Sequence, residues 1–314
     1  MDRKPVSVKS YANIAIVKYW GKADAERMIP STSSISLTLE NMYTETKLSF
    51  LPEDATGDVM YIDDELQGEK ETTKASKVLD LFRTDPNQHV KIETWNNMPT
   101  AAGLSSSSSG LSALVKAANE LFQVGKTQSE LAQIAKFASG SSSRSFFGPL
   151  AAWDKDSGEV YQVETDLKLA MIMLVLTDQK KPVSSRDGMK LCTETSTSFP
   201  EWIKQSEQDY KDMLGFLKAN DFQAVGELTE ANALRMHQTT STANPPFSYL
   251  TDASYQAMDK VKALRASGEQ CYFTMDAGPN VKVLCLEEDL DRLADHFRKD
   301  YQVIVSRTKE LPDD

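Results

Sequence analysis

The chain has 314 residues, enough for two domains or for one two-lobed unit with a sizeable core. Its composition, 40% hydrophobic and 26% charged, is ordinary for a globular protein, and its formal net charge is −11. That negative charge argues against a surface for nucleic acids or anionic membranes, although a few local cations could still bind a small anion.

Signals for targeting, disulfides and metals are weak. Residues 1–15 lack an apolar signal region, and the strongest apolar run, residues 169–176, is far shorter than the ~20 residues of a membrane-spanning helix. The three cysteines are odd in number and share no C-x-x-C spacing, and the three histidines are isolated from one another. We therefore expect buried free thiols, no zinc site and a soluble cytoplasmic protein.

The first hundred residues carry mostly strand signals, with β-branched and aromatic residues between turn-formers. The expected strands are residues 6–20, 34–40, 43–51 and 59–66, followed by a helix over 73–83 and a strand over 89–95.

Helices dominate the rest of the chain. Two are expected over 111–122 and 129–139, the second with Thr127 as N-cap and Glu130 at the capping-box position. A hairpin around 156–158 and a buried strand over 169–176 follow. The remaining elements are a mostly helical stretch over 185–265 broken at Pro200 and 245–246, two strands within 271–286, a helix over 287–299 and a strand over 301–306. This order predicts an α+β architecture with two lobes.

Five consecutive serines, residues 105–109, lie between two glycines, after a predicted strand and directly before an amphipathic helix. Small residues let backbone N–H groups approach a ligand, and the start of the helix adds unpaired donors and the positive end of its dipole. This favours a polyphosphate site. A flexible Ser-rich linker is the alternative, but linkers are usually flanked by polar or Pro-rich sequence. The segment is neither a Walker loop nor a G-x-G-x-x-G motif.

Four further clusters have both a structural and a functional interpretation. Lys18 and Lys22 flank an aromatic pair, either as exposed lysines of an edge strand or as ligands. Arg144 lies among small residues, either satisfying helix-terminal carbonyls or presenting its fork to an anion. Asp276 is in an Asp-Ala-Gly-Pro-Asn turn, where it could simply bond its own backbone. Residues 180–189 are compatible with both a capped helix start and an anion site.

These clusters resemble known motifs. Residues 99–107 resemble the Pro-x-x-x-Gly-Leu-x-Ser-Ser loop of the GHMP kinase superfamily, and SYANIAIVKYWGK (10–22) resembles the N-terminal signature of mevalonate diphosphate decarboxylases. The segments Gly-Ser-x-x-Arg-Ser (140–145) and Thr-Met-Asp-Ala-Gly-Pro-Asn (274–280) also resemble motifs of that family. The four motifs fall in the family's order, and the similarity runs from about Val6 to Thr308.

The resemblance implies a two-lobed GHMP kinase fold of the α+β class, with mixed and antiparallel sheets and a ribosomal protein S5 domain 2-like N-terminal lobe. Residues 1–181 would form the ATP-binding lobe and residues 182–314 the C-terminal GHMP-type lobe, around one cleft. The implied reaction is the ATP-dependent decarboxylation of (R)-mevalonate 5-diphosphate to isopentenyl diphosphate, with ADP, phosphate and carbon dioxide as the other products. The implied cofactors are ATP and Mg²⁺, the metal being held mainly through ATP phosphates, with a loop serine as candidate protein ligand. The implied partners are small molecules, and a homodimer is expected because the family commonly forms one.

The resemblance also assigns residues. Asp276 would be the catalytic base, Arg144 would hold the substrate and its carboxylate, and Lys18 would offset negative charge. The substrate-binding residues would be Ala12, Asn13, Tyr19, Trp20, Gly21, Lys22, Ser139, Gly140, Ser141, Ser142, Ser143, Arg144, Ser185, Arg186 and Met189. The ATP-binding residues would be Pro99, Ala101, Gly103, Leu104, Ser105, Ser106, Ser107 and Ser108.

Two alternatives stay open at this point. One is a small-molecule kinase of the same superfamily, acting on mevalonate or phosphomevalonate without decarboxylation, although its first motif would normally be Pro-Gly-Arg/Lys-Val-rich. The other is a non-catalytic phosphate-binding or sensor protein.

Overall fold

The computed structural model describes residues 4–98, 106–177 and 181–311. Two long antiparallel strands, β1 (Val6–Val17) and β4 (Ser34–Phe50), run through the middle of the fold. The sequence predicted two strands within 34–51, which is wrong, because β4 is continuous over 17 residues. No glycine or proline lies within it, and its pairing with β1 shifts register between Tyr11 and Asn13, where the extra residues lie in β4 between Thr38 and Tyr43.

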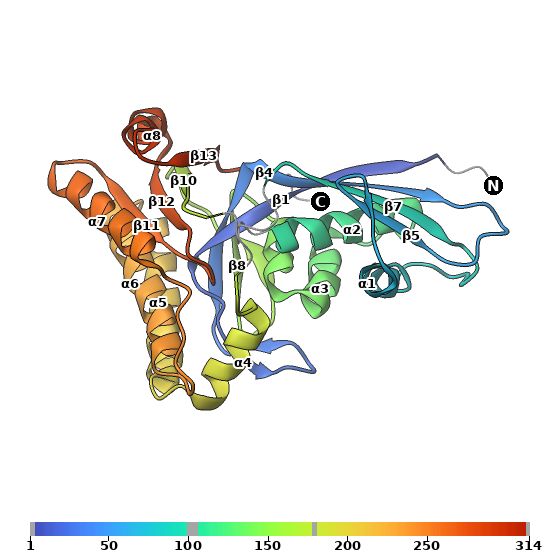
Figure 1. The fold of residues 1–314 in the computed structure, drawn as a ribbon, viewed down its shortest axis with the longest axis horizontal. Coiled ribbons are helices and arrows are strands. Elements are labelled where there is room, and N and C mark those ends of the chain that lie inside the picture. Colours follow the sequence, from blue (N-terminus) through green and yellow to red (C-terminus); the bar gives the residue numbers. More distant parts are fainter. Residues whose placement is uncertain (1–3, 99–105, 178–180, 312–314) are drawn as a thin grey trace.

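β4 lies at the centre of a seven-stranded sheet whose other strands come from the N-terminal half of the chain. The order is β6 (Glu65–Leu66), β5 (Val59–Ile62), β7 (Val90–Asn96), β4, β8 (Leu150–Trp153) and β9 (Val160–Gln162), with β1 also paired to β4. One face is covered by α1 (Glu69–Leu79), α2 (Ser106–Leu121) and α3 (Gln128–Ala138), as Figure 1 shows. A small hairpin of β2 (Lys22–Asp24) and β3 (Ile29–Pro30) follows β1.

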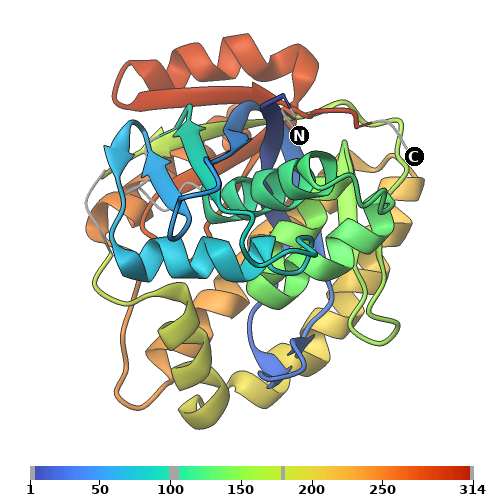
Figure 2. The same cartoon turned by 90° about the vertical axis from the view of Figure 1, so that its right-hand side faces the viewer.

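A second, antiparallel sheet forms the other lobe, in the order β11 (Cys271–Thr274), β12 (Val281–Leu286), β10 (Leu169–Val175) and β13 (Gln302–Arg307). Strand β10 thus belongs to the second sheet, although it lies before residue 181, where the N-terminal lobe was predicted to end. α7 (Asp252–Ala266) and α8 (Leu290–Arg298) pack on this sheet through one apolar cluster (Figure 2).

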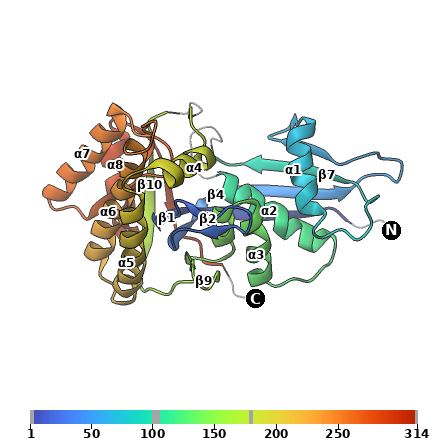
Figure 3. The same ribbon diagram turned by 90° about the horizontal axis from the view of Figure 1, so that it is seen from below.

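One continuous core joins the lobes. Ile14 and Leu37 of the first sheet, Met171 of the second and Met213 of α5 (Phe199–Lys218) are all fully buried in the same cluster. α6 (Phe222–Ser241) runs beside α5, and α4 (Ser185–Thr195) lies between the helices of the two lobes when the molecule is viewed from below (Figure 3). Because this core is shared, the position of one lobe against the other is fixed by packing.

Several local predictions are confirmed. Thr127 caps α3 and forms the expected capping box with Glu130. The predicted break at Pro200 coincides with the start of α5, where a proline in the first turn sacrifices no intrahelical hydrogen bond. The cysteines are free and buried. None of the helices in the described ranges is both long and apolar enough to cross a membrane.

Candidate active site

A cavity of about 860 Å³, called the cleft below, lies where the two lobes meet. The end of β1, the start of α2, the 3-10 helix η1 (Gly140–Phe146), α4 and the β11–β12 connection all contribute to its wall. Among the residues that the structure describes, its charged lining residues are Lys18, Lys22, Arg144, Lys181, Arg186, Asp187 and Asp276. Five cations against two carboxylates make the cleft locally positive in a chain of net charge −11, as a site for polyanions requires.

Asp276 is held by two lysines. Its Oδ1 accepts a hydrogen bond from Lys18 Nζ at 2.7 Å, and its Oδ2 accepts one from Lys282 Nζ at 3.1 Å. Both ammonium groups are buried, at 2% and 1% side-chain exposure, whereas 28% of the Asp276 side chain is exposed. The carboxylate is thus accessible from the cleft and is supported from behind by two cations.

Burial alone would raise the pKa of Asp276, but the adjacent ammonium groups of Lys18 and Lys282 outweigh it and hold the pKa below its usual range. Burial also lowers the pKa of Lys18, and the attraction of Asp276 opposes this effect. Asp276 is therefore ionised at neutral pH and can accept a hydrogen bond or a proton.

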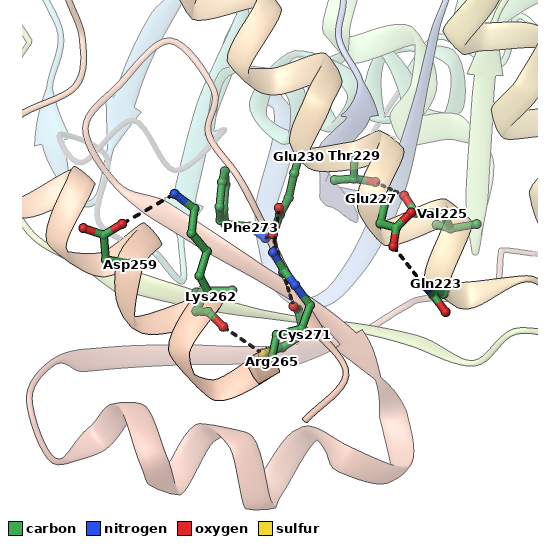
Figure 4. A network of polar contacts seen from close by, with 11 residues as sticks. Gln223, Val225, Glu227, Thr229, Glu230, Asp259, Lys262, Arg265, Cys271 and Phe273 are labelled. Atoms are coloured by element: carbon green, nitrogen blue, oxygen red, sulfur yellow. Dashed lines mark hydrogen bonds and ion pairs between the residues drawn. The ribbon is translucent and has the colours of Figure 1, made fainter. Parts of the chain in front are cut away.

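The backbone before Asp276 is fixed by a polar clamp between α6, α7 and β11, shown in Figure 4. Arg265 donates to both carboxylate oxygens of Glu230, at 2.6 and 3.0 Å, and to the carbonyl of Cys271 at 2.7 Å. Glu230 Oε1 in turn accepts the backbone N–H of Phe273 at 3.0 Å. β11 is an edge strand, so this glutamate satisfies an otherwise unpaired donor three residues before Asp276.

Lys18 is positioned from the opposite side. Its backbone N–H donates to Asn232 Oδ1 at 2.8 Å, and its Nζ donates to the carbonyl of Ala15 at 2.6 Å. Asn232 lies on α6 and is itself held by the buried Asp209 of α5 at 2.8 Å. Helix α6 therefore supports both the strand before Asp276 and the backbone of Lys18.

Arg144 projects from η1 with 2% of its surface exposed. Its Nε donates to Ser36 Oγ at 3.0 Å and one terminal nitrogen donates to Ser34 Oγ at 2.6 Å, so two hydroxyls of β4 orient the guanidinium. Burial lowers the pKa of Arg144 to about 10, yet the group stays charged at neutral pH. Within the described residues it forms no ion pair at salt-bridge distance, which leaves its charge available to a bound anion.

The serine run does not form the loop that the sequence suggested, since α2 begins at Ser106 within it. Ser107 lines the cleft, whereas Ser108 and Ser109 are fully buried, and Ser109 shares a hydrogen bond of 2.7 Å with Thr44. Ser106 is the first helical residue. Of the other predicted ATP contacts, Pro99, Ala101, Gly103, Leu104 and Ser105 lie outside the described residues.

Most of the predicted substrate-binding residues line the cleft, namely Asn13, Tyr19, Trp20, Lys22, Ser139, Gly140, Ser141, Arg144, Ser185, Arg186 and Met189. Ala12 and Gly21 do not, although Gly21 has φ +106° and allows the close packing of Phe199. Ser142 and Ser143 do not either. Their hydroxyls donate to backbone carbonyls within or next to η1, at 2.6 Å to Ser139 and 2.8 Å to Gly140.

A second cavity, of about 650 Å³, lies against the C-terminal half of α2. None of the predicted site residues within the described part of the chain lines it. Its Lys116 donates to Ser10 Oγ at 3.1 Å and to the carbonyl of Ser145 at 3.3 Å, and burial lowers its pKa to about 8. The motif residues converge on the cleft, which we therefore take as the active site.

Two family models account for nearly the whole chain. One, the diphosphomevalonate decarboxylase-like N-terminal domain, matches residues 10–163, and the other, the mevalonate 5-diphosphate decarboxylase C-terminal domain, matches residues 171–312. The chain belongs to the diphosphomevalonate decarboxylase family. The predicted family and its two-lobed GHMP kinase fold are thereby confirmed.

Individual members of the family are similar to this chain over most of its length. The diphosphomevalonate decarboxylase of Candida albicans is 32% identical over 91% of this chain and 86% of its own length. The structure of mevalonate pyrophosphate decarboxylase from Streptococcus pyogenes is 66% identical, with a TM-score of 0.97 over 100% of this chain and 99% of that one. A structure of MDDEF in complex with MVAPP, AMPPCP and magnesium is 40% identical, with a TM-score of 0.89 over 98% of both chains.

Sequence reasoning did not single out two lysines near Asp276, although one of them, Lys181, lies in the 180–189 segment that was considered as an anion site. Lys181 donates to Ser185 Oγ at 2.6 Å and to the carbonyl of Ala277 at 2.7 Å, and so bridges the start of α4 to the Asp276 turn. Lys282 contacts Asp276 directly. The only available signal for Lys282 was a lysine within the otherwise apolar strand VKVLCL.

Proposed function

We propose that this cleft performs the reaction of the family: ATP phosphorylates the tertiary hydroxyl of mevalonate 5-diphosphate, and loss of phosphate and carbon dioxide gives isopentenyl diphosphate. The observation that carries the proposal is the ionised carboxylate of Asp276, held by Lys18 and Lys282. It lies in the same cleft as Arg144, which forms no ion pair with any residue that the structure describes. A base for the alcohol and a cation for the carboxylate are the two groups that this chemistry needs.

In the first step the hydroxyl oxygen at C3 attacks the γ-phosphorus of ATP, and the bond from that phosphorus to the β,γ-bridging oxygen breaks to release ADP. The hydroxyl proton passes to Asp276. Two ammonium groups stabilise the Asp276 carboxylate and make it a weak base, so we expect the proton to move late, once bonding to phosphorus has made the hydroxyl acidic. A positioned base contributes about 10²- to 10⁴-fold in rate.

In the second step the C3–O bond breaks, phosphate leaves, and the electron pair of the C1–C2 bond becomes the new C2=C3 double bond as carbon dioxide departs. We assign the C1 carboxylate to Arg144, whose planar fork suits a carboxylate. Ser34 and Ser36 hold the fork in place, so the C1–C2 bond can be kept aligned with the leaving phosphate.

We assign the remaining cations of the cleft to binding of the phosphate groups. Lys22 and Arg186 line the cleft without a carboxylate partner at salt-bridge distance among the described residues, and both suit the substrate's diphosphate. The N-terminus of α2, with Ser107 in the cleft wall, suits the triphosphate of ATP because its first N–H groups have no intrahelical partner.

The same cleft can accommodate Mg²⁺ alongside ATP. Within the described ranges no cluster of three or more His, Cys, Asp or Glu side chains could hold a metal by itself, which fits an ion bound mainly through phosphate oxygens. The Ser107 hydroxyl is a hard oxygen in the cleft wall and would be the protein ligand. Bound Mg²⁺ would neutralise charge on the phosphates.

Product analysis tests the proposal. With ATP and mevalonate 5-diphosphate, we expect ADP, phosphate, carbon dioxide and the alkene in equal amounts. Formation of ADP without carbon dioxide would instead support the related small-molecule kinase. Binding of both ligands without turnover would support a sensor.

We propose further that residues 1–181 carry ATP, that residues 182–314 complete the cleft, and that the protein works as a cytoplasmic homodimer. Size-exclusion chromatography with light scattering measures the assembly state directly, and a mass of one chain, 34.9 kDa, would contradict the dimer.

A further inference from the structure

Lys282 is a buried charge at the second position of the otherwise apolar strand β12. It lies on β12, in register with Met173 of β10 on one side and Thr274 of β11 on the other, and only 1% of its side chain is exposed. Among the described residues, its ion pair is with Asp276 alone, at 3.1 Å.

Such a lysine is not expected to add net stability. Removing an ammonium from water costs several kcal/mol, and replacing buried ionic groups with apolar side chains of similar volume is often neutral or stabilising. A methionine would fit this strand, since its register partner on β10 is Met173. A contribution to stability therefore does not explain a lysine at this position.

The charged and titratable groups around Asp276 come from four other places. Lys18 lies at the end of β1, Lys181 precedes α4, Arg144 lies on η1 and His237 lies on α6. Burial lowers the pKa of His237 to about 4, so its ring is neutral at pH 7. Lys181 and Arg144 hydrogen-bond elsewhere, so of these groups in the described residues, Lys18 and Lys282 alone contact the carboxylate directly.

Each of these two lysines contacts a different oxygen of the Asp276 carboxylate. Lys18 bonds Oδ1 and Lys282 bonds Oδ2, so the group is held at two points and cannot turn about its Cβ–Cγ bond without breaking one contact. Each oxygen retains a further lone pair, so the carboxylate can still accept a hydrogen bond from a ligand in the cleft.

We propose that Lys282 is a positioning residue of the reaction, which fixes the orientation of the Asp276 carboxylate and sets the acid limit of turnover. This inference rests on the proposed role of Asp276 as the base. It assigns the lysine two separable contributions, a hydrogen bond to Oδ2 and a positive charge.

The charge has a predictable sign. An opposite charge within about 4–6 Å lowers the pKa of an aspartate by about 1–3. Removing Lys282 should therefore raise the pKa of Asp276, and activity should be lost at a higher pH on the acid side. Bound diphosphate and triphosphate are anions and also raise the pKa of Asp276. The effect of removing Lys282 should therefore be sought in the pH dependence of kcat, which reports the enzyme–substrate complex.

The test uses Lys282→Met, which removes the bond and the charge, and Lys282→Gln, which keeps a donor without the charge. We expect Lys282→Met to lower kcat roughly 10- to 100-fold with the KM for ATP within about threefold, and to move the acid limb of kcat upward by about one pH unit or more. Lys282→Gln should recover part of kcat while keeping the shifted acid limb. Lys168→Met, at a lysine with 69% side-chain exposure next to β10, is the matched control and should change neither quantity.

The outcomes separate this inference from the proposed function. If the wild-type chain releases no carbon dioxide, the proposed function fails. If the wild type is active and Lys282→Met keeps its kcat and its acid limb, the inference about Lys282 is wrong. If neither variant folds, the lysine is needed for stability, which also contradicts the inference.

Discussion

Arg144 illustrates how single residues in this cleft are prepared for anions. Its guanidinium is buried, its donors are oriented by two serines, and its charge has no carboxylate partner at salt-bridge distance among the described residues. Burying this charge costs free energy in the unliganded protein, and binding of a substrate carboxylate compensates that cost.

We predict that Arg144→Met lowers kcat/KM for the diphosphate substrate by at least about 100-fold, because the bidentate contact to the carboxylate is lost. The melting temperature should not fall, since the variant removes an unpaired buried charge. Steady-state kinetics and calorimetry measure the two effects. Activity like that of the wild type would exclude Arg144 from the mechanism.

Asp276 should also appear in the pH dependence of stability. Because its folded-state pKa is held below the usual value, its contribution to stability is present above about pH 4 and is lost as the pH falls through the folded pKa. The difference in unfolding free energy between the wild type and Asp276→Asn should be largest near neutral pH and shrink on acidification. Urea unfolding at several pH values measures it, and a constant difference would contradict the assigned ion pairs.

Asp276 and Arg144 could be identified from the sequence because each lies in a short motif that resembles a family pattern. Lys282 could not. Its position within VKVLCL indicates a buried strand, and its contact with Asp276 depends on how the β11–β12 turn folds back, which spacing alone does not specify. Lys181 lies in the 180–189 segment considered as an anion site, but its contact with Ala277 could not be foreseen for the same reason, since the two residues are 96 positions apart.

At the scale of elements, α6 connects the chemistry to the scaffold. It holds the Lys18 backbone through Asn232 and the β11 edge through Glu230, so both sides of the Lys18–Asp276 pair depend on one helix. The sequence predicted helix here, but not which face meets the second sheet.

The packing of α6 on β11 depends on Gly226. A Cβ at this position would lie 2.0 Å from the ring of Tyr272, so Gly226→Ala must displace the strand or the helix. We predict a destabilisation of about 1–3 kcal/mol, together with reduced kcat. The matched control is Gly215→Ala on the neighbouring α5, where nothing lies within 4 Å, and we expect it to stabilise by about 0.4–1 kcal/mol. Equal effects from the two alanines in denaturant unfolding would refute the proposed contact.

The Glu230 clamp makes a separate prediction. Glu230→Gln weakens the bonds to Arg265 and to the Phe273 N–H, and we expect it to lower the unfolding free energy by about 1–3 kcal/mol and to reduce kcat. Glu227→Gln, one turn earlier on the exposed side, weakens the hydrogen bond that Glu227 accepts from Gln223 (Figure 4) and should change neither quantity. The prediction fails if Glu227→Gln is as damaging as Glu230→Gln.

At the scale of the whole molecule, the two-lobed architecture followed from the order of predicted elements and from the family resemblance, whereas its details did not. The sequence pattern divided β4 into two predicted strands separated by Asn41 and Met42, and the serine run was expected to be a loop although α2 begins within it. In both places long-range pairing and packing override local preference.

The shared core explains why one cleft results. Apolar residues of both sheets and of α5 and α6 are buried together, so the base, its lysines and Arg144 are brought together from segments between residues 18 and 282. The cations gather at this junction, and the molecule as a whole remains acidic.

The most direct measurement is the rate of carbon dioxide release by Asp276→Asn against the wild type, with ATP and mevalonate 5-diphosphate at saturation and nucleotide binding measured in parallel. The account predicts a loss of at least about 100-fold in rate with nucleotide binding retained, because the base is replaced while the phosphate contacts are kept. Release of carbon dioxide at the wild-type rate would contradict it.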